Sequence, residues 1–596
     1  MDMLLLYKSL TVNDIDYGRR VHGIPNGLLA IGASARSIGY DVDIYNLSCF
    51  SERTENEFLA NLPSVNYLIG LTQLTLNRHA VYALAKKLRK HYPQIPIVIG
   101  GVHASLFPEE ILRGHPEIDY IVLGEADFTI QELLSVLQNS GNVKNVENLA
   151  WRSNGRVYVN KRSSGISNLD DLPYTQDYYA DNLVLSSRGC PYKCAFCAAN
   201  KNCRMKSVDR VMNELNKLIQ IRGISHAAFV DDLFAVNEKR VKEMTTGILS
   251  LPGPLTYTCT LRANVTTEAM IQNLVKSGCT IAYIGFESGS DEVLRIYQKR
   301  ITSNDIIKAI QICRNYCLDI AASLIFSGVH DNESSFEKTK LVLEKAQPTD
   351  ISVNALYLAP GSYLYDEAVA AGEVDAGIWE QSDEGQPEEA FAGYPEKLAR
   401  ARKFISDLID FFRHLKKSIQ YTTRECETAW KKYGYSVMGL KLAYRYLDDR
   451  RFLESYELLD ELEKKGYKHL DVYSGKAFSL AGLDKGEEGL KKLSEWEKHH
   501  PLTKEYWLRK GMLLEQMTCY GEAIESYKNV YNPIDGGYEE LMRIAVVHEK
   551  AGNIAAALET YQNIIDTYHI YSKNVNYFVL GKIKYLENQK SKKILH

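Results

Sequence analysis

Three cysteines share one short segment of this chain in a pattern that suits a metal centre. Cys190, Cys194 and Cys197 follow a C-x3-C-x2-C spacing, which lets three thiolates face one another from a tight loop. Three thiolates are one short of the four that usually hold a [4Fe-4S] cluster, so one iron would stay open to a substrate or cofactor. A zinc site would need a fourth ligand, for which Cys203 is the nearest candidate. Because 11 cysteines in 596 residues produce this spacing by chance in roughly half a per cent of cases, we favour the cluster over zinc or coincidence.

Polar side chains also stand where strands of the same region are expected to end. Glu287 and Ser288 follow one predicted strand, Asp231 and Asp232 end another, and Arg262 ends a third. A carboxylate at a strand end can bind hydroxyl or ammonium groups, and an arginine can pair with the carboxylate of a cofactor. The structural alternatives are a salt bridge at the barrel rim for Glu287 and a helix N-cap for either aspartate.

Three loops nearer the N-terminus follow predicted strands as well. Their glycines would let a ligand approach the backbone closely, although they are equally compatible with simple turns between strand and helix. No Gly-x-Gly-x-x-Gly sequence opens a helix after the first predicted strand, so a dinucleotide is not the favoured ligand. The residues that we consider as ligand contacts are Thr72, Gln73, Leu74, Thr75, Gly100, Gly101, His103, Gly124 and Glu125.

The first stretch of the chain, residues 1–143, must supply the sheet that positions these loops. Short apolar runs alternate there with amphipathic segments such as 27–37, 78–90 and 108–113. This alternation predicts a parallel, doubly wound, Rossmann-like sheet, whose ligands bind beyond the carboxyl ends of the strands. The predicted strands are 4–7, 41–45, 67–71, 97–99 and 120–123.

A connector over residues 144–181 leads to a second alternation of strands and helices over 182–372. Six strand–helix units in succession predict a partial (βα)6 barrel of TIM type, with its chemistry at the carboxyl ends of the strands. The cysteine loop directly follows the first of these strands. The predicted strands are 183–187, 227–231, 256–261, 281–285, 320–326 and 351–357, and the helices between them are 208–220, 238–250, 268–277, 304–316 and 334–345.

The third stretch shows no strands and contains an internal repeat. After an acidic loop (372–396) and a helical linker within 373–434, small residues recur every 34 positions over 435–575, before a tail at 576–596. This all-α array resembles tetratricopeptide repeats. We expect either a surface that binds a protein or peptide partner, or a dimerisation or stabilising module. The recurring small residues are Ala443, Ala477, Gly511 and Ala545 in one set and Ser455, Gly489, Ala523 and Ala557 in the other.

Composition excludes several classes of protein. With 45% hydrophobic and 24% charged residues the chain is neither disordered, collagen-like nor a small disulfide scaffold. A net charge of −4 gives no electrostatic reason to expect nucleic acid or an anionic membrane as a partner. The apolar run near Met1 is too short for a signal peptide, and no window reaches the roughly 18 apolar residues of a membrane span. Free thiols persist in reducing compartments, so we expect a cytoplasmic protein.

The cysteine loop resembles that of radical S-adenosylmethionine (radical SAM) enzymes, in which an aromatic residue, here Phe196, precedes the last cysteine. Other segments resemble the branch of this superfamily that carries an N-terminal cobalamin-binding domain, and the resemblance covers residues 1 to about 370. The segments that carry it are 25–29, 100–103, 124–127, 187–191, 229–234, 285–290 and 359–362.

The resemblance implies a set of cofactors and their contacts. Cys190, Cys194 and Cys197 would hold a [4Fe-4S] cluster whose unique iron binds S-adenosylmethionine, and an electron from a flavodoxin or ferredoxin type of donor would release a 5′-deoxyadenosyl radical. Glu287 and Ser288 would contact the ribose or the amino group of S-adenosylmethionine. Thr72, Gln73, Leu74 and Thr75 would flank the corrin ring of cobalamin, and Gly100, Gly101 and Gly124 would line its nucleotide tail.

Two departures from the expected patterns bear on these contacts. The Asp-x-His-x-x-Gly motif that supplies a histidine to cobalt in other B12 proteins is absent, and neither His79 nor His103 stands in that context. Cobalamin would therefore lack a lower histidine ligand from that motif. The loop after the fifth barrel strand, 327–332, departs from the usual glycine–proline–glycine form; its His330 could meet substrate, although turn chemistry alone explains the segment.

The function that these features predict is methylation of an unactivated carbon of a peptide or natural product by way of methylcobalamin. The alternative within enzymes is a radical cyclisation or rearrangement without methyl transfer. A repeat-based adaptor with an inactive barrel is the alternative outside enzymes, and the intact cysteine triad argues against it.

Overall fold

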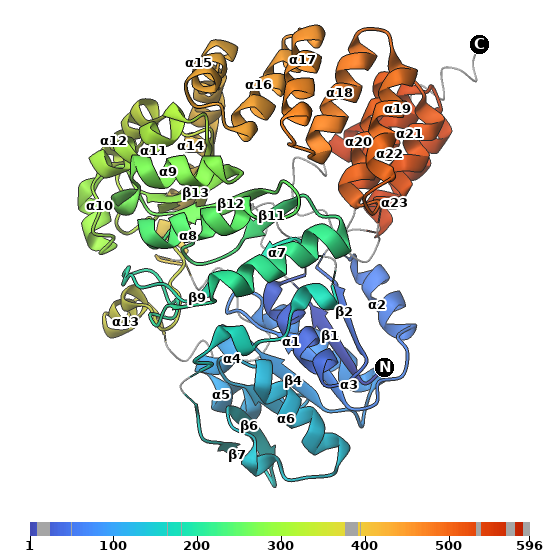
Figure 1. The fold of residues 1–596 in the computed structure, drawn as a ribbon. Coiled ribbons are helices and arrows are strands. Elements are labelled where there is room, and N and C mark those ends of the chain that lie inside the picture. Colours follow the sequence, from blue (N-terminus) through green and yellow to red (C-terminus); the bar gives the residue numbers. More distant parts are fainter. Residues whose placement is uncertain are drawn as a thin grey trace. The chain divides into compact units, whose positions relative to one another are not determined.

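The computed structural model describes residues 1–8, 24–48, 50–163, 165–179, 181–375, 391–393, 395–531, 538–567 and 578–587. The chain divides into two compact units, which Figure 1 colours along the sequence. Unit 1 comprises Met1–Tyr179, Leu358–Phe391 and Tyr531–His596, and unit 2 comprises Ala180–Tyr357 and Ala392–Val530.

Unit 1 is built on a seven-stranded sheet in the order β2-β1-β3-β4-β5-β6-β7. The first five strands run parallel, and β6 and β7 continue the sheet antiparallel. The elements are β1 (Met3–Tyr7), α1 (Asn26–Ser37), β2 (Val42–Asn46), α2 (Glu52–Ala60), β3 (Leu68–Thr72), α3 (Arg78–His91), β4 (Ile97–Gly100), α4 (Val102–Leu106), α5 (Pro108–Gly114), β5 (Tyr120–Val122), α6 (Asp127–Gln138), β6 (Leu149–Ser153) and β7 (Arg156–Val159).

Helices cover both faces of this sheet, because successive residues of a strand point to opposite sides. Met3 and Leu5 of β1 pack with α1 and α6, whereas Leu4 and Leu6 pack with α3 and α5. The predicted doubly wound sheet is thereby confirmed. The hairpin of β6 and β7 lies in the segment expected to be a connector, and β7 is an exposed edge strand of the sheet.

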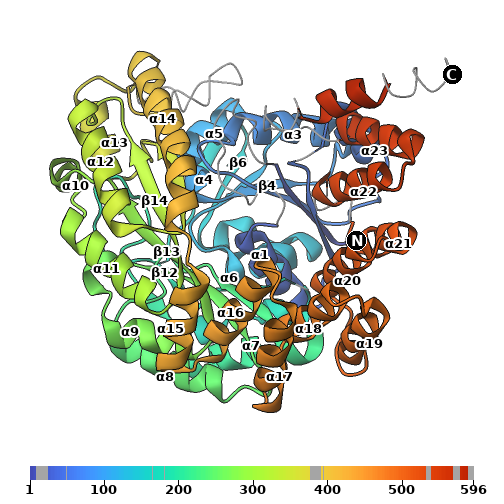
Figure 2. The same ribbon diagram turned by 90° about the horizontal axis from the view of Figure 1, so that it is seen from above.

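Unit 2 contains a six-stranded parallel sheet in the order β15-β14-β13-β12-β11-β8. Its edge strands β8 and β15 are not paired with each other, which makes the curved sheet the predicted partial barrel, and Figure 2 shows α9, α11 and α12 outside its strands. The elements are β8 (Leu183–Val184), α7 (Val208–Arg222), β11 (His226–Phe229), α8 (Glu238–Leu249), β12 (Thr256–Leu261), α9 (Glu268–Lys276), β13 (Cys279–Glu287), α10 (Asp291–Ile296), α11 (Ser303–Asn315), β14 (Asp319–Phe326), α12 (Glu333–Ala346) and β15 (Asp350–Ala355).

Along β14 the two faces of the barrel sheet differ in burial. Along β14, Ile320, Ala322 and Leu324 are buried under the surrounding helices, whereas Ala321 and Ser323 between them are partly exposed. The partly exposed positions therefore face the interior of the partial barrel.

The remaining helices include the expected repeats. The recurring small residues lie buried on the first and second helix of successive pairs, and a Cβ on Gly489 would lie 2.7 Å from the carbonyl oxygen of Ala477, so the close helix approach is confirmed there. Most of the predicted acidic loop and most of the tail lie outside the described residues. The helices are α13 (Tyr363–Ala370), α14 (Glu396–Ile419), α15 (Thr423–Tyr433), α16 (Ser436–Asp448), α17 (Phe452–Lys464), α18 (Leu470–Gly482), α19 (Gly486–Glu497), α20 (Lys504–Gln516) and α21 (Tyr520–Lys528), followed in unit 1 by α22 (Tyr538–Lys550) and α23 (Ile554–Thr567).

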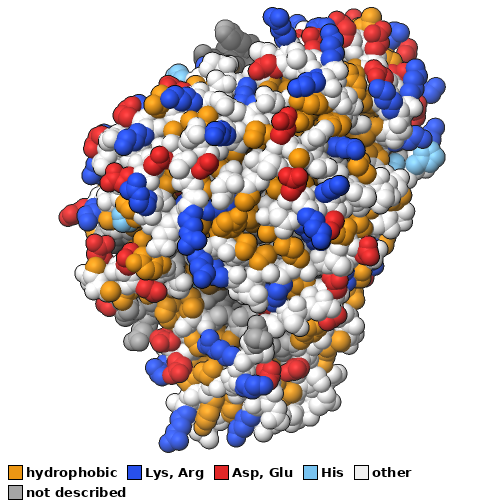
Figure 3. Space-filling model, turned by 60° about the vertical axis from the view of Figure 1, so that its left-hand side comes forward, with side chains coloured by type: hydrophobic (Ala, Val, Ile, Leu, Met, Phe, Trp, Pro, Cys, Tyr) orange, Lys and Arg blue, Asp and Glu red, His pale blue; other side chains and the backbone are white. Residues whose placement is uncertain are grey.

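Charge is mixed over the surface. On the face that Figure 3 shows, basic and acidic side chains alternate over short distances, as the small net charge of the sequence suggests. Within the described ranges, none of the helices combines the length and apolarity needed to cross a membrane.

Candidate active site

The loop that bears the three spaced cysteines is closed at its base by two short strands. β9 (Ser187–Arg188) pairs antiparallel with β10 (Arg204–Met205), and Cys190 N donates to the carbonyl oxygen of Asn200 at 2.8 Å. Gly189 makes this closure possible: its φ is +86°, and a Cβ there would lie 2.6 Å from the carbonyl oxygen of Asn202. The loop is thus a compact structure that begins at the end of the first barrel strand.

All three thiols of the loop are free and partly exposed. Ala199 N donates to Cys197 Sγ at 3.4 Å, and Arg262 Nη1 lies 3.7 Å from Cys194 Sγ. Such N–H donors stabilise thiolates and tune the potential of a cluster that they hold. Among the residues that the structure describes, no group of three or more His, Cys, Asp or Glu side chains is arranged to hold a metal ion. Burial raises the pKa of the Cys190 and Cys203 thiols.

Arg262, at the end of β12, is held against the cysteine loop. Its guanidinium lies 3.9 Å from the ring centroid of Tyr192, its Nε donates to Asn264 Oδ1 at 2.9 Å, and its Nη2 donates to the carbonyl oxygen of Lys299. The structure therefore brings Arg262 and Cys194 together, as a role at the cluster requires.

Glu287 ends β13 in a strained backbone conformation, with φ at +59°. Its buried carboxylate forms an ion pair with Lys299, so a salt bridge is present at this residue, as the structural alternative foresaw. The side chain of Phe196 lies beside this pair, with its ring centroid 5.8 Å from Lys299 Nζ. Ser288 is buried, and its Oγ accepts from Ser290 N at 3.2 Å, which fixes the turn after the strand.

The aspartates after β11 do not cap a helix. α8 begins at Glu238 and its N-cap is Asn237, so the N-cap interpretation of Asp231 and Asp232 is wrong. Asp231 Oδ1 instead accepts from the hydroxyls of Ser186 at 3.0 Å and Ser187 at 2.5 Å, and its buried Oδ2 has no hydrogen-bond partner among the described residues. Burial raises the pKa of both aspartates.

The loop after β14 is explained by turn chemistry. Asp331 Oδ2 accepts from Ser327 N at 2.8 Å, and Asn332 caps α12. Burial raises the pKa of Asp331 to about 6. His330 packs edge-to-face against Tyr297 with ring centroids 6.3 Å apart, so the loop has an internal reason for its sequence.

The strand ends of unit 1 present apolar side chains to solvent. Leu74 after β3, Val102 and Leu106 after β4, and Phe128 after β5 are 49%, 54%, 42% and 38% exposed. Leu74 is presented by its neighbours, because its N–H donates to Asn77 Oδ1 at 2.7 Å while Gln73 and Thr75 beside it are buried. An apolar rim at the carboxyl edge of a parallel sheet fits a large planar ligand such as a corrin.

The glycines of these loops divide into two kinds. Within the described part of the chain, Gly100 and Gly124 have open space where a Cβ would stand, which leaves room for a ligand. Gly101 has φ +112°, and its missing Cβ would press on the backbone of Gln73, so it serves the turn. Thr72 ends β3, and Glu125 Oε2 accepts from Ile166 N at 2.8 Å, which makes Glu125 a link to the following segment.

The two histidines near this edge are neutral at pH 7. His103 is fully buried, its Nδ1 lies 3.1 Å from Thr75 Oγ1, and burial lowers its pKa to about 3. Burial also lowers the pKa of His79, to about 4, and neither of its ring nitrogens has a hydrogen-bond partner in the described part of the chain. The open glycines, the apolar rim and this unpartnered imidazole together fit a bound corrinoid.

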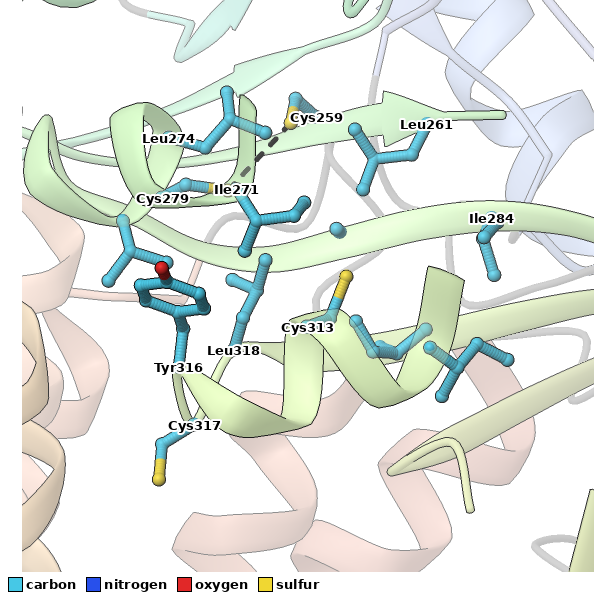
Figure 4. Close-up of a cluster of buried hydrophobic side chains, with 14 of the residues drawn as sticks. Cys259, Leu261, Ile271, Leu274, Cys279, Ile284, Cys313, Tyr316, Cys317 and Leu318 are labelled. Carbon is cyan, nitrogen blue, oxygen red and sulfur yellow. Dashed lines mark hydrogen bonds between the residues drawn. The ribbon is translucent and has the colours of Figure 1, made fainter. Parts of the chain in front are cut away.

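Three further cysteines lie in the core of the barrel. Cys259, Cys279 and Cys313 are buried among apolar side chains of the barrel, where Cys259 and Cys279 have their Sγ atoms 3.7 Å apart (Figure 4). Sequence reasoning missed Tyr192, Tyr297 and Lys299 as contacts of the site, because no motif spacing marks them.

Comparison with known families agrees with this geometry. A B12-binding domain model matches residues 19–134, and a Radical SAM superfamily model matches residues 184–342. The chain therefore contains a radical SAM domain preceded by a B12-binding domain, and these domains imply a [4Fe-4S] cluster, S-adenosylmethionine and cobalamin as cofactors, in agreement with the motifs.

Individual relatives cover part of the chain. An uncharacterized methyltransferase of Pyrococcus horikoshii is 29% identical over 51% of this chain and 69% of its own length. An anaerobic magnesium-protoporphyrin IX monomethyl ester cyclase of Synechocystis is 26% identical over 52% of this chain and 66% of its own. The solved structure of the cobalamin-dependent S-adenosylmethionine radical enzyme OxsB, with aqua-cobalamin and S-adenosylmethionine bound, shares the fold with a TM-score of 0.53 at 15% identity, covering 84% of each chain.

Proposed function

We propose that this enzyme transfers a methyl group from S-adenosylmethionine to an unactivated carbon of a small molecule or peptide. The observation that carries the proposal is the presence, in one chain, of the free cysteine loop beside Arg262 and of a sheet edge with the open glycines and apolar rim of a corrinoid site. The methyltransferase relative supports the same reaction class.

The residues of unit 2 would bind and orient S-adenosylmethionine. Cys190, Cys194 and Cys197 would hold the cluster, which supplies the electron that cleaves S-adenosylmethionine once an external donor has reduced it. Arg262, whose Nη1 lies 3.7 Å from Cys194 Sγ, would pair with a carboxylate near the cluster, and Glu287 would accept hydrogen bonds from the cofactor.

The residues of unit 1 would hold cobalamin, which supplies the transferable methyl group. Leu74 has no atom that coordinates a metal, and His103 is buried with its Nδ1 3.1 Å from Thr75 Oγ1, so both side chains would contribute to the walls of the cobalamin site rather than bind its metal. Gly100 and Gly124 would admit the nucleotide tail at the strand ends.

The substrate would enter the partial barrel of unit 2. The interior positions of β14 are occupied by Ala321, Ser323 and Ile325, which are partly exposed and uncharged. This part of the barrel wall suits an uncharged carbon skeleton with hydrogen-bonding groups better than a polyanion.

Where the repeats contact the barrel of unit 2, these contacts favour a stabilising role of the repeats over a partner-binding role. His469 is buried, with its Nε2 3.0 Å from the carbonyl oxygen of Ser225, and the ring of Pro501 would lie 2.8 Å from a Cβ on Gly223. We therefore propose that this part of the array braces the barrel from the segment before β11.

The second candidate function is radical cyclisation without methyl transfer. The similarity to a cyclase, at nearly the identity and coverage of the methyltransferase relative, favours it specifically. The two functions use the same cofactors and differ in where the methyl group of S-adenosylmethionine ends.

Methyl-labelled S-adenosylmethionine distinguishes the two functions. Anaerobically reconstituted enzyme with cobalamin, a reductant and a panel of candidate substrates should form 5′-deoxyadenosine, S-adenosylhomocysteine and a labelled product. The appearance of 5′-deoxyadenosine alone, with an unlabelled product, would replace methyl transfer by the second candidate. Cys194→Ala should abolish iron binding and 5′-deoxyadenosine, whereas Cys519→Ala, at a free and partly exposed cysteine of the repeats, should leave both unchanged.

A further inference from the structure

Lys299 is a buried lysine that no motif marks. It lies in the short segment between α10 and α11 and is 5% exposed, although lysine is among the residues least often buried. Its Nζ forms an ion pair with the carboxylate of Glu287, which is itself 6% exposed. The pair therefore holds two opposite charges away from water beside the cysteine loop.

The backbone around Lys299 contacts two parts of the candidate site, the cysteine loop and Arg262. The carbonyl oxygen of Tyr297 accepts from Ala195 N at 2.9 Å within the cysteine loop, and the carbonyl oxygen of Lys299 accepts from Arg262 Nη2. The residues on either side of Lys299 have φ values of +49° at Gln298 and +54° at Arg300. Non-glycine residues adopt this conformation when the surrounding structure imposes it, which indicates that the segment is a rigid turn.

The ion pair occupies a slot that β13 leaves open. A Cβ on Gly285 would lie 2.5 Å from Lys299 Nζ and 2.7 Å from Glu287 Oε1, so the pair in its present position uses the space that glycine leaves. On its other side Lys299 Nζ lies 5.8 Å from the ring centroid of Phe196, the aromatic residue of the cysteine loop. The ammonium group thus joins the end of β13 to the loop that would hold the cluster.

We propose that Lys299 is a positioning residue for S-adenosylmethionine. It holds the Glu287 carboxylate in one orientation. Through Phe196 and its own carbonyl oxygen, it also fixes the positions of the cysteine loop and Arg262 relative to that carboxylate. A buried ion pair seldom stabilises a fold more than apolar residues of the same size would, so its geometry at this place serves preorganisation of the site. The inference rests on the S-adenosylmethionine half of the proposed function and is independent of methyl transfer.

Five variants test the proposal, and one of them is Glu287→Gln alone. Lys299→Met removes the charge at similar length, and Lys299→Arg restores it. Glu287→Gln combined with Lys299→Met removes both charges and leaves no buried carboxylate of this pair behind. Lys476→Met is the matched control, because Lys476 is also buried and ion-paired, with Asp460 and Glu463, but lies in the repeats. The readouts are iron content and the change that S-adenosylmethionine titration causes in the electron paramagnetic resonance spectrum of the reduced cluster.

The expected result is a selective loss of S-adenosylmethionine affinity. Lys299→Met should keep the iron content and bind about 10- to 100-fold more weakly, as expected for the loss of one charge-assisted hydrogen bond. Lys299→Arg should bind S-adenosylmethionine within about threefold of the affinity of the original enzyme. The double variant should have an affinity within about threefold of that of Glu287→Gln alone, since the lysine acts through the glutamate. Lys476→Met should bind with the affinity of the original enzyme.

Three outcomes would overturn the proposal. They are unchanged affinity in Lys299→Met, equal weakening in Lys299→Met and Lys476→Met, and a double variant that binds far more weakly than Glu287→Gln alone. If Lys299→Met does not assemble its cluster, the proposal is tested by comparing the S-adenosylmethionine affinity of the double variant with that of Glu287→Gln alone. None of these readouts involves methyl transfer, so failure of the methylation proposal would leave them unaffected.

Discussion

Replacing Gly101 by alanine should destabilise the edge of the unit 1 sheet that we assign to cobalamin. Gly101 has φ 112° and ψ 176°, a conformation that strains any residue with a Cβ by about 1–3 kcal/mol. The new Cβ would also press on the carbonyl oxygen of Gln73 and lie 3.0 Å from its nitrogen. Gln73 N donates to the carbonyl oxygen of Gly100 at 2.7 Å, so relief of the clash would lose this bond as well. The expected total is about 2–4 kcal/mol.

Gly100→Ala is the matched control for this substitution. None of the described atoms lies within 4 Å of a Cβ built on Gly100, so its local stability should change by less than about 1 kcal/mol. The Cβ would instead occupy the open space at the strand end. Gly100→Ala should therefore leave the sheet intact and weaken cobalamin binding, measured by spectral titration.

Hydrogen–deuterium exchange of peptides from β3 and β4 measures the local stability directly. A loss of 2–4 kcal/mol accelerates exchange by about 30- to 900-fold where local opening governs it. Peptides from β12 and β13 of unit 2 serve as the internal reference. The reasoning is refuted if Gly101→Ala exchanges like the original protein, or if Gly100→Ala accelerates exchange equally.

Three further predictions follow from the buried groups. Asp331 has its pKa raised from 3.8 to about 6 by burial, so the folded state holds its proton more tightly than the unfolded state, and its contribution to stability falls as pH rises from about 4 to about 6. In urea unfolding, the free energy of unfolding of Asp331→Asn, relative to that of the original protein, should therefore rise by about 2 kcal/mol between pH 4 and pH 7. A difference between the two proteins that does not change with pH would contradict this. His103→Gln should leave the electron paramagnetic resonance spectrum of bound Co(II) cobalamin unchanged, since His103 is enclosed; loss of a nitrogen hyperfine pattern would show that it is a ligand. Gly489→Ala should lower the thermal stability of the repeats by about 1–3 kcal/mol because its Cβ would lie 2.7 Å from a carbonyl oxygen of α18, whereas Gly521→Ala, with open space around it, should raise stability slightly in the same melting experiment.

The elements with a strong periodic signal were predictable from the sequence. The five buried strands of unit 1 and the six barrel strands are apolar runs between amphipathic helices, and β3, predicted as 67–71, is observed at Leu68–Thr72. The hairpin of β6 and β7 was not predictable in this way, because an edge hairpin exposes one side and pairs antiparallel with its neighbour. Pattern reasoning therefore recovers the core of each sheet better than its edges.

The candidate site divides along a similar line. The three cysteines were predictable because their spacing is itself the chemical requirement, and Arg262 because it follows a strand. Asp231 and Asp232 were given an N-cap alternative because a helix follows them, yet the cap is Asn237, several residues later. An acidic residue after a strand has too many local uses for its position alone to decide among them.

Lys299 shows why the residues that fix geometry are harder to find than those that hold a cofactor. It lies 12 positions after its partner Glu287, on the far side of a helix, so no helical or strand period relates the two. The only trace in the sequence is Gly285, whose missing side chain makes room for the pair, and a glycine within a strand can equally mark a bulge or a sharp bend. Ligand residues are constrained by the chemistry of what they bind, and this constraint appears as spacing. Positioning residues are constrained by the three-dimensional path of the chain. That constraint becomes visible only when β13, the turn around Lys299 and the cysteine loop are seen together.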